Sequence, residues 1–185
     1  MFLFIGLGNP GERYRRTRHN LGFRVVDRLS ERLGAQMQKG AGSYRIAQTE
    51  IGAEPAILAE PLTYMNRSGI AVFDLVNRYD VPLSRTMVVC DDIHLPFGRL
   101  RIRSGGSDGG HNGLASVVRY LCDDAFPRLR MGIGTPAGGD VIQFVLSPFS
   151  REEKTLVEKM VDRSVDALIK IVEHGLEKAM SEYNR

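Results

Sequence analysis

Two short, uninterrupted apolar runs constrain the fold more than any other feature of the chain. Residues 2–7 read FLFIGL and residues 86–90 read TMVVC, and each run has the length of a strand. Strands of this kind are buried between layers, as in α/β proteins. Between them, residues 21–33 carry apolar side chains at helical spacing, at positions 21, 25, 26, 29 and 33. We therefore expect strands and helices to alternate in an α/β layer structure.

Periodicity and turn residues predict the remaining elements. Strands are expected at residues 43–50, 55–60, 99–103, 128–133 and 140–146, with residues 51–54 as a hairpin turn. Helices are expected at residues 68–79, capped by Ser68, and at 114–122. A long amphipathic helix is expected within 151–182, with one apolar side formed by Leu156, Val157, Met160, Val161, Val165, Leu168, Ile169 and Val172. At 185 residues, the chain suits one domain spanning positions 1–185.

Composition excludes several classes of protein. The longest apolar runs are strand-sized, so no membrane span is expected. The first residues lack the basic lead and the cleavage site of a signal peptide. Cys90 and Cys122 lie apart, without metal-type spacing, and are interpreted as reduced thiols of a cytosolic protein.

Arginine is unevenly distributed along the chain. Residues 1–32 hold seven arginines against three acids, and residues 99–130 hold six against three. Within 99–103 arginine alternates with apolar residues, which predicts a strand with one basic, solvated face. Planar guanidinium groups suit phosphate because they bind two oxygens at once. The arginines could bind phosphate, or they could equally well form a solvated face that only keeps the protein soluble.

A glycine motif near the amino end resembles a dinucleotide-binding turn. Gly6, Gly8 and Gly11 have the GxGxxG spacing, but no helical periodicity follows until Leu21. Pro10 also removes an N–H group from the turn that would have to bind phosphate. No acidic residue stands at the end of a second strand, as the motif requires. A nicotinamide-dependent oxidoreductase is therefore disfavoured.

Four polar loops lie next to predicted strands or helices, where α/β proteins place their sites. Together they offer a histidine, a carboxylate and several amides, without a nucleophile elbow, a Walker lysine or a pair of metal-type histidines. This set favours a histidine general base acting on water, an aspartate that orients it, and amide groups at the oxyanion. The loops are Asn9–Tyr14 with His19, residues 63–68, Asp91–Asp92, and His111–Asn112.

Each of these residues also has an ordinary structural interpretation. A single histidine such as His19 is more often structural than catalytic. Asp91 and Asp92 could bind Mg²⁺, although no third acid lies nearby in the sequence. Asn9 and Asn66 could simply shape turns. The glycines within residues 105–110 could form a moving lid or a rigid turn.

Taken together, the blocks resemble bacterial-type peptidyl-tRNA hydrolases. The matching stretches are GLGNPGERYRRTRHNLGF (6–23), EPLTYMNRSGIAV (60–72), VVCDDIHLPFGRLRIRSGGSDGGHNGLASV (88–117) and RLRMGIG (128–134). The resemblance implies a single α/β domain with a twisted mixed β-sheet sandwiched between helices, monomeric and cytoplasmic, without metal or cofactor. It implies hydrolysis of the ester between a peptide and the terminal ribose of tRNA.

The resemblance also implies a role for individual residues. His19 would activate water and Asp91 would orient it, while Asn66 would bind a carbonyl oxygen or assist the oxyanion. Further residues would contact substrate: Asn9 and Asn112 along the peptide path, Tyr14, Met65 and His111 around the cleft, and Arg101, Arg103 and Arg130 on the tRNA backbone.

Two positions depart from the family pattern. Cys90 stands where a histidine is common, and His94 stands where an aspartate is common. Neither is a main catalytic position, and His94 would add a titratable charge if it lay at the cleft rim. The alternative function is an RNA-binding relative that has kept this fold and lost catalysis. Retention of His19 and Asp91 favours the enzyme.

Overall fold

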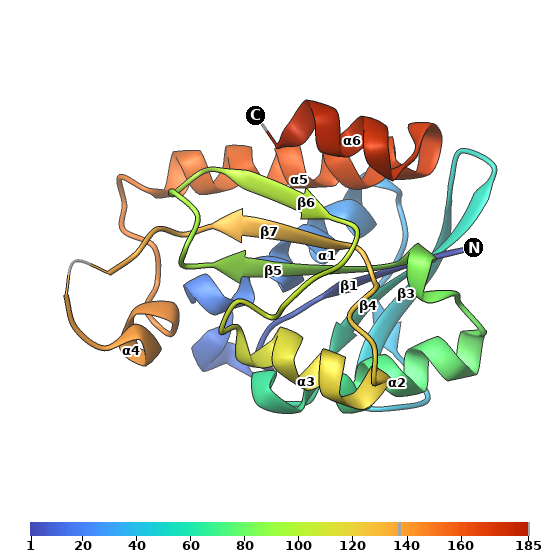
Figure 1. Cartoon of the computed structure of the whole chain (residues 1–185), viewed down its shortest axis with the longest axis horizontal. Helices are drawn as coiled ribbons and strands as arrows, with labels where there is room; N and C mark the ends of the chain where they lie inside the picture. The colour runs from blue at the N-terminus through green and yellow to red at the C-terminus, as the bar shows by residue number, and fades with distance from the viewer. Residues whose placement is uncertain (137, 185) are drawn as a thin grey trace.

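The computed structural model describes residues 1–136 and 138–184, which form one seven-stranded sheet with helices on both faces (Figure 1). The strand order is β2-β3-β4-β1-β5-β7-β6. The strands are β1 (Phe2–Gly6), β2 (Gln38–Lys39), β3 (Tyr44–Ile51), β4 (Glu54–Pro61), β5 (Thr86–Asp92), β6 (Leu100–Arg103) and β7 (Arg128–Gly132). The α-helices are α1 (Leu21–Arg32), α2 (Ser68–Tyr79), α3 (Asn112–Leu121), α4 (Val141–Val145), α5 (Lys154–His174) and α6 (Leu176–Tyr183).

The sheet is mixed, as the sequence predicts. Strands β4, β1, β5 and β7 run parallel, while β3 and β6 pair antiparallel on either side of them and β2 pairs antiparallel with β3. The carboxyl ends of the four parallel strands therefore meet at one edge, the place where α/β proteins bind ligands. None of the described helices combines the length and the apolar character that crossing a bilayer requires.

Two apolar layers separate the sheet from its helices. Alternate residues of β1 point to opposite faces: Phe4 packs with α1 and α5, whereas Leu3 and Ile5 pack with α2 and α3. Figure 1 shows α1, α5 and α6 on one side of the sheet and α2 and α3 on the other. Burial on both faces is the reason why β1 and β5 read as continuous apolar runs.

Helix α1 packs unusually close to the end of β1, and the glycine motif explains this contact. A side chain at Gly6 would place its Cβ 2.2 Å from the carbonyl oxygen of Gly22. A Cβ at Gly22 would lie 2.3 Å from the backbone nitrogen of Leu7. These glycines let strand and helix touch backbone to backbone, which fixes the start of α1 over the carboxyl end of the sheet.

Three sequence expectations need correction. Residues 141–145 form helix α4 instead of a strand, because Asp140 caps it by accepting a hydrogen bond from the backbone of Ile142 at 2.8 Å. The long amphipathic helix expected within 151–182 is present as α5, but it ends at Gly175, whose φ is 85°, and the residues after it form the separate helix α6. Leu156 is 41% exposed and lies off the apolar side predicted for it.

The predicted cap of α2 is also wrong. Ser68 is the first helical residue, not the N-cap, and its hydroxyl donates to the carbonyl oxygen of Met65 at 2.8 Å. The N-cap position belongs to Arg67, which makes no side-chain cap bond. The hairpin is as predicted, with β3 and β4 paired up to Ile51 and Glu54.

Candidate active site

His19 lies at the carboxyl edge of the sheet, on a single 3₁₀ turn (Arg18–Asn20) that leads into α1. A turn this short does not hold its own shape. Arg18 anchors it, because its guanidinium forms two hydrogen bonds with the Glu153 carboxylate at 2.9 and 2.8 Å. The same guanidinium lies 4.5 Å from the Phe144 ring and 4.6 Å from the Phe149 ring. No local sequence pattern singles out Arg18, because its partners are all distant in the sequence.

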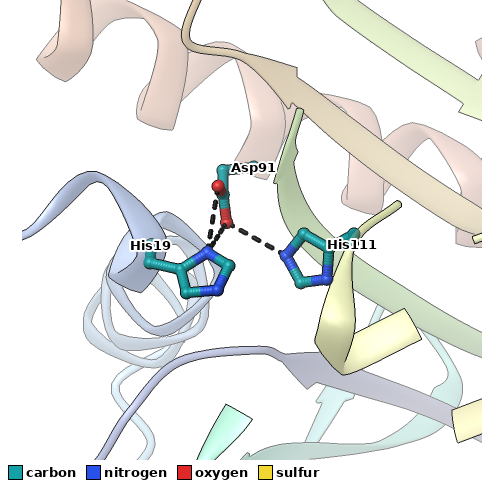
Figure 2. A group of neighbouring side chains, drawn as sticks. All are labelled: His19, Asp91 and His111. Carbon is teal, nitrogen blue, oxygen red and sulfur yellow. Dashed lines mark hydrogen bonds and ion pairs between the residues drawn. The ribbon is translucent and has the colours of Figure 1, made fainter. Parts of the chain in front are cut away.

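Asp91, at the end of β5, lies between two imidazole rings (Figure 2). His19 Nδ1 is 2.9 Å from Asp91 Oδ1 and 3.1 Å from Oδ2. On the other side, His111 Nε2 is 3.1 Å from Asp91 Oδ1. The structure thus brings together two residues predicted to act as a pair and adds His111 as a second partner of the carboxylate.

The helix cap determines which nitrogen of His111 carries the proton. His111 is the N-cap of α3, and its Nδ1 accepts hydrogen bonds from the backbone of Gly113 at 3.1 Å and Leu114 at 3.2 Å. Since Nδ1 accepts, the proton of the neutral ring is on Nε2, which donates to Asp91. His19 Nδ1 donates to the same carboxylate. The Nε2 atom of a neutral His19 is therefore left with a free lone pair.

The electrostatics keep Asp91 ionised although it is 2% exposed. Burial would raise the pKa of Asp91, but the adjacent imidazoles of His19 and His111 and their hydrogen bonds hold it well below its ordinary value. An ionised carboxylate accepts from both rings at once. It thereby orients His19 and favours the imidazolium that forms when His19 takes a proton.

The same three residues have the composition of a metal site. His19, Asp91 and His111 bring ligand atoms within 4.8 Å of one another, and Zn²⁺ accepts two imidazoles and a carboxylate. Coordination through His111 Nε2 would move the ring proton to Nδ1. There it would oppose the two backbone N–H groups of α3. The two hydrogen bonds that His111 Nδ1 accepts therefore disfavour a metal ion at these three residues. That the site works without a metal stays a prediction.

A pocket of about 70 Å³ opens onto this cluster. Its polar end is formed by His19, Asp91 and His111, with Asn112 and Arg130 beside them. Its apolar wall comes from α4, whose Val141, Ile142 and Val145 line it. A few polar groups at one end of a partly apolar pocket are the arrangement expected of a ligand-binding site.

The asparagines predicted to contact substrate lie in different settings. Asn9 is buried, and its Oδ1 accepts a hydrogen bond from the backbone of Met65 at 2.8 Å. Asn20 holds it in place by bonding both its backbone N–H and its carbonyl oxygen at 2.9 Å. No sequence pattern singles out Asn20, because both of its hydrogen bonds go to a residue of another segment. Because Asn9 Oδ1 is occupied, its amide N–H groups are the atoms that it can offer to a ligand.

Asn66 and Asn112 are both exposed. Asn112 is the first residue of α3 and lines the pocket, whereas Asn66 lies on the 3₁₀ turn that precedes α2 and is not among the lining residues. Met65 is buried beside it. Tyr14 is half-buried and meets the exposed ring of Tyr64 edge to face, with ring centroids 6.4 Å apart.

The predicted tRNA contacts share one face of the β6–β7 ladder. Arg101 is opposite Arg130, and Arg103 is opposite Arg128. Arg101 and Arg103 are exposed. Arg130 is already engaged: its side chain is 11% exposed, pairs with Asp92 at 3.1 Å and donates to the carbonyl oxygen of Ser107 at 2.5 Å. Ser107 belongs to the glycine-rich loop, residues 104–110, which leads to His111.

The two positions that depart from the family pattern, Cys90 and His94, lie outside the pocket. Cys90 is fully buried, and burial raises the pKa of its thiol, so it is inert packing. His94 is exposed and does not line the pocket. Its backbone N–H donates to Asp92 at 2.8 Å.

The fold and the site define a class: an α/β protein in which a histidine, hydrogen-bonded to a buried aspartate, lies at the carboxyl ends of the parallel strands of a mixed sheet. Comparisons with known proteins give the family. The peptidyl-tRNA hydrolase family profile matches residues 3–185. The peptidyl-tRNA hydrolase of Caldanaerobacter subterraneus subsp. tengcongensis is 45% identical over 184 residues, which cover 100% of both chains. That of Aquifex aeolicus is 43% identical over 99% of this chain and 96% of its own. The chain belongs to the peptidyl-tRNA hydrolase family.

A solved structure agrees with this assignment. The crystal structure of peptidyl-tRNA hydrolase from Acinetobacter baumannii superposes with a TM-score of 0.94 at 32% identity, covering 100% of this chain and 94% of that one. The predicted α/β class with its mixed sheet between helices is therefore confirmed.

Proposed function

We propose that this chain hydrolyses the ester bond between the peptide and the 3′-terminal ribose of peptidyl-tRNA, which releases tRNA for reuse. Membership of the family supports the reaction. The observation that carries the mechanism is the His19–Asp91 pair, which leaves His19 Nε2 as a free base beside the pocket.

In this mechanism His19 Nε2 removes a proton from water while the water oxygen attacks the ester carbonyl carbon. Asp91, ionised and held by His111, fixes the His19 tautomer and stabilises the imidazolium. The imidazolium then protonates the departing ribose oxygen. General base catalysis of this kind contributes about 10²–10⁴ in rate.

Amide groups are assigned to the substrate. Asn9 and Asn112 line the peptide path, and Asn66 donates to a carbonyl oxygen or to the oxyanion, where one donor adds about 10²–10³ in rate. Tyr14 and Met65 shape the cleft around them. We expect the site to accept a peptide amide next to the ester and to reject a free α-ammonium group.

The tRNA backbone is assigned to Arg101 and Arg103, with Arg130 at the pocket. Such contacts carry little sequence information, which suits an enzyme that accepts many tRNAs. We expect the protein to act as a monomer in the cytoplasm. We expect no cofactor and no metal.

An N-blocked aminoacyl-tRNA is the substrate that tests the proposal. The wild-type protein should release tRNA from the blocked ester and leave the unblocked form intact. His19→Ala should lose at least about 10²-fold in kcat, because it removes the general base, while equilibrium binding of uncharged tRNA is retained.

His174→Ala is the matched control, since His174 is exposed at the end of α5 and should turn over like the wild type. Wild-type tRNA binding without any cleavage would identify the chain as the non-catalytic relative. Normal turnover by His19→Ala would exclude the mechanism.

A further inference from the structure

Arg128 is a buried cation that the proposed mechanism does not use. The residue is 1% exposed, and its guanidinium is part of no ion pair within 4.0 Å among the described residues, although the more distant Asp124 carboxylate partly offsets the lowering of its pKa. Burial, and then the charge of Arg130, lower its pKa. A buried charge without a counter-ion is costly unless other acceptors surround it. Here the acceptors are backbone carbonyl groups, and their positions indicate what the residue does.

These carbonyl groups belong to two segments, which one backbone hydrogen bond, from Gly106 N–H to the Asp124 carbonyl oxygen at 3.2 Å, also joins. On one side the guanidinium donates to Gly106 and, at 3.2 Å, to Ser107, both in the glycine-rich loop. On the other side it donates to Asp124 at 2.8 Å and to Phe126 at 3.1 and 3.2 Å. The Phe126 ring lies 4.4 Å from it. A planar group with five donors can bridge two segments in this way, whereas an ammonium group acts from a single point.

The bridged loop ends at the active site. Its far end is His111, whose backbone N–H donates to Asp108 at 3.1 Å and whose ring donates to Asp91. Between these points Arg130 also binds the Ser107 carbonyl oxygen. Two arginines therefore contact the middle of the loop, at Gly106 and Ser107, and these contacts favour a rigid turn over a moving lid.

We propose that Arg128 is a positioning residue: by tying the glycine-rich loop to the segment before β7, it holds His111 where its Nε2–H meets Asp91. The proposal rests on the proposed function, because its effect is read in ester hydrolysis. Arg128 does not touch substrate. It acts through the loop on the carboxylate that orients His19.

Two variants test this assignment. Arg128→Lys keeps the charge and Arg128→Met keeps the length without charge, and neither can bridge the two segments. Both should lose about tenfold or more in kcat on N-blocked aminoacyl-tRNA, since small displacements of catalytic groups cost this much. The Kd for uncharged tRNA and its salt dependence should stay at wild-type values. Backbone amides of residues 104–111 should exchange hydrogen faster.

Arg163→Met is the matched control, because Arg163 also donates to a backbone carbonyl and stacks on an aromatic ring, that of Tyr183, on the opposite face of the sheet. It should keep wild-type kcat. If Arg128→Met does not fold, the kcat of Arg128→Lys, measured well below the unfolding temperature of that variant, provides the test. Wild-type kcat in the folded variants, or a changed salt slope with normal kcat, would overturn the proposal. Absence of turnover in the wild type would instead refute the proposed function.

Discussion

On strand β4 the carboxyl group of Glu60 is buried, and its Oε1 atom has no hydrogen-bond partner among the described residues. Its Oε2 atom accepts a hydrogen bond from Arg45 at 3.0 Å. Burial, and then the nearby carboxylate of Asp27, raise the pKa of Glu60 to about 8 despite Arg45. Glu60 is therefore largely protonated at neutral pH, and its proton is part of the folded structure.

Glu60→Gln should make the stability of the protein less sensitive to alkali. The folded pKa of about 8 lies above the ordinary value of 4.5, so the wild type loses stability as the pH rises from about 4.5 to about 8. Thermal unfolding should show equal stability near pH 4.5 and a more stable variant at pH 9. The difference is at most about 5 kcal/mol, because a tenfold change in proton affinity is worth about 1.4 kcal/mol. Glu50→Gln, exposed on β3, serves as the control, and a pH-independent difference would contradict this account.

At the scale of elements, the turn that carries His19 depends on a helix far along the chain. Arg18 joins it to Glu153 at the start of α5, and Arg18 N–H donates to the Ser147 carbonyl oxygen at 3.0 Å. The hydrogen bonds from Arg18 hold the pKa of Glu153 below its ordinary value. The segment between α4 and α5 thus determines where the base lies.

Arg18→Lys should lower kcat by about tenfold, because a lysine cannot reproduce the two-point contact with Glu153. Binding of uncharged tRNA should change little. Arg32→Lys is the control: Arg32 pairs with Asp166 on the exposed side of α1, and exposed ion pairs contribute about 0–1 kcal/mol. Steady-state kinetics of both variants provide the measurement. A similar kcat for the two variants would show that Arg18 does not position His19.

The elements that could be predicted are those whose signal is local. The apolar runs of β1 and β5 and the periodicity of α1 reflect burial that each segment carries in its own sequence. Helix α4 was missed because its β-branched residues favour a strand, while its cap and the absence of a strand beside it decide otherwise. The His19–Asp91 pair followed from strand ends and family motifs. The Nδ1 cap of His111 and the anchor role of Arg18 depend on contacts between distant segments, which no local pattern contains.

At the scale of the whole molecule, the arginines of the two basic regions, residues 1–32 and 99–130, differ in their ion pairing. Arg24, Arg28 and Arg32 on α1 pair with acids of α5, namely Glu158, Asp162 and Asp166. These surface ion pairs offset the charge of three of the seven arginines in the first region. Arg101 and Arg103 on β6 are exposed and have no ion pair among the described residues. We therefore expect phosphate to meet the β6 edge and not α1.

Arg103→Ala should weaken tRNA binding and lower the slope of log K against log salt concentration by about one, the contribution of one phosphate contact. Arg32→Ala should leave the slope unchanged. Binding isotherms at several salt concentrations provide the measurement. Equal slopes for the wild type and Arg103→Ala would show that Arg103 does not contact a tRNA phosphate.

The link between Arg18 and Glu153 has a consequence for biosynthesis. Translation makes the amino-terminal turn early, but its anchor emerges only after more than four fifths of the chain has been made. Until then the turn lacks its contact with Glu153, and its hydrogen bonds with Asn9 and Asp91 are what hold it. A growing polypeptide is itself esterified to tRNA, and we therefore expect the nascent enzyme to position His19 fully only when the chain is nearly complete.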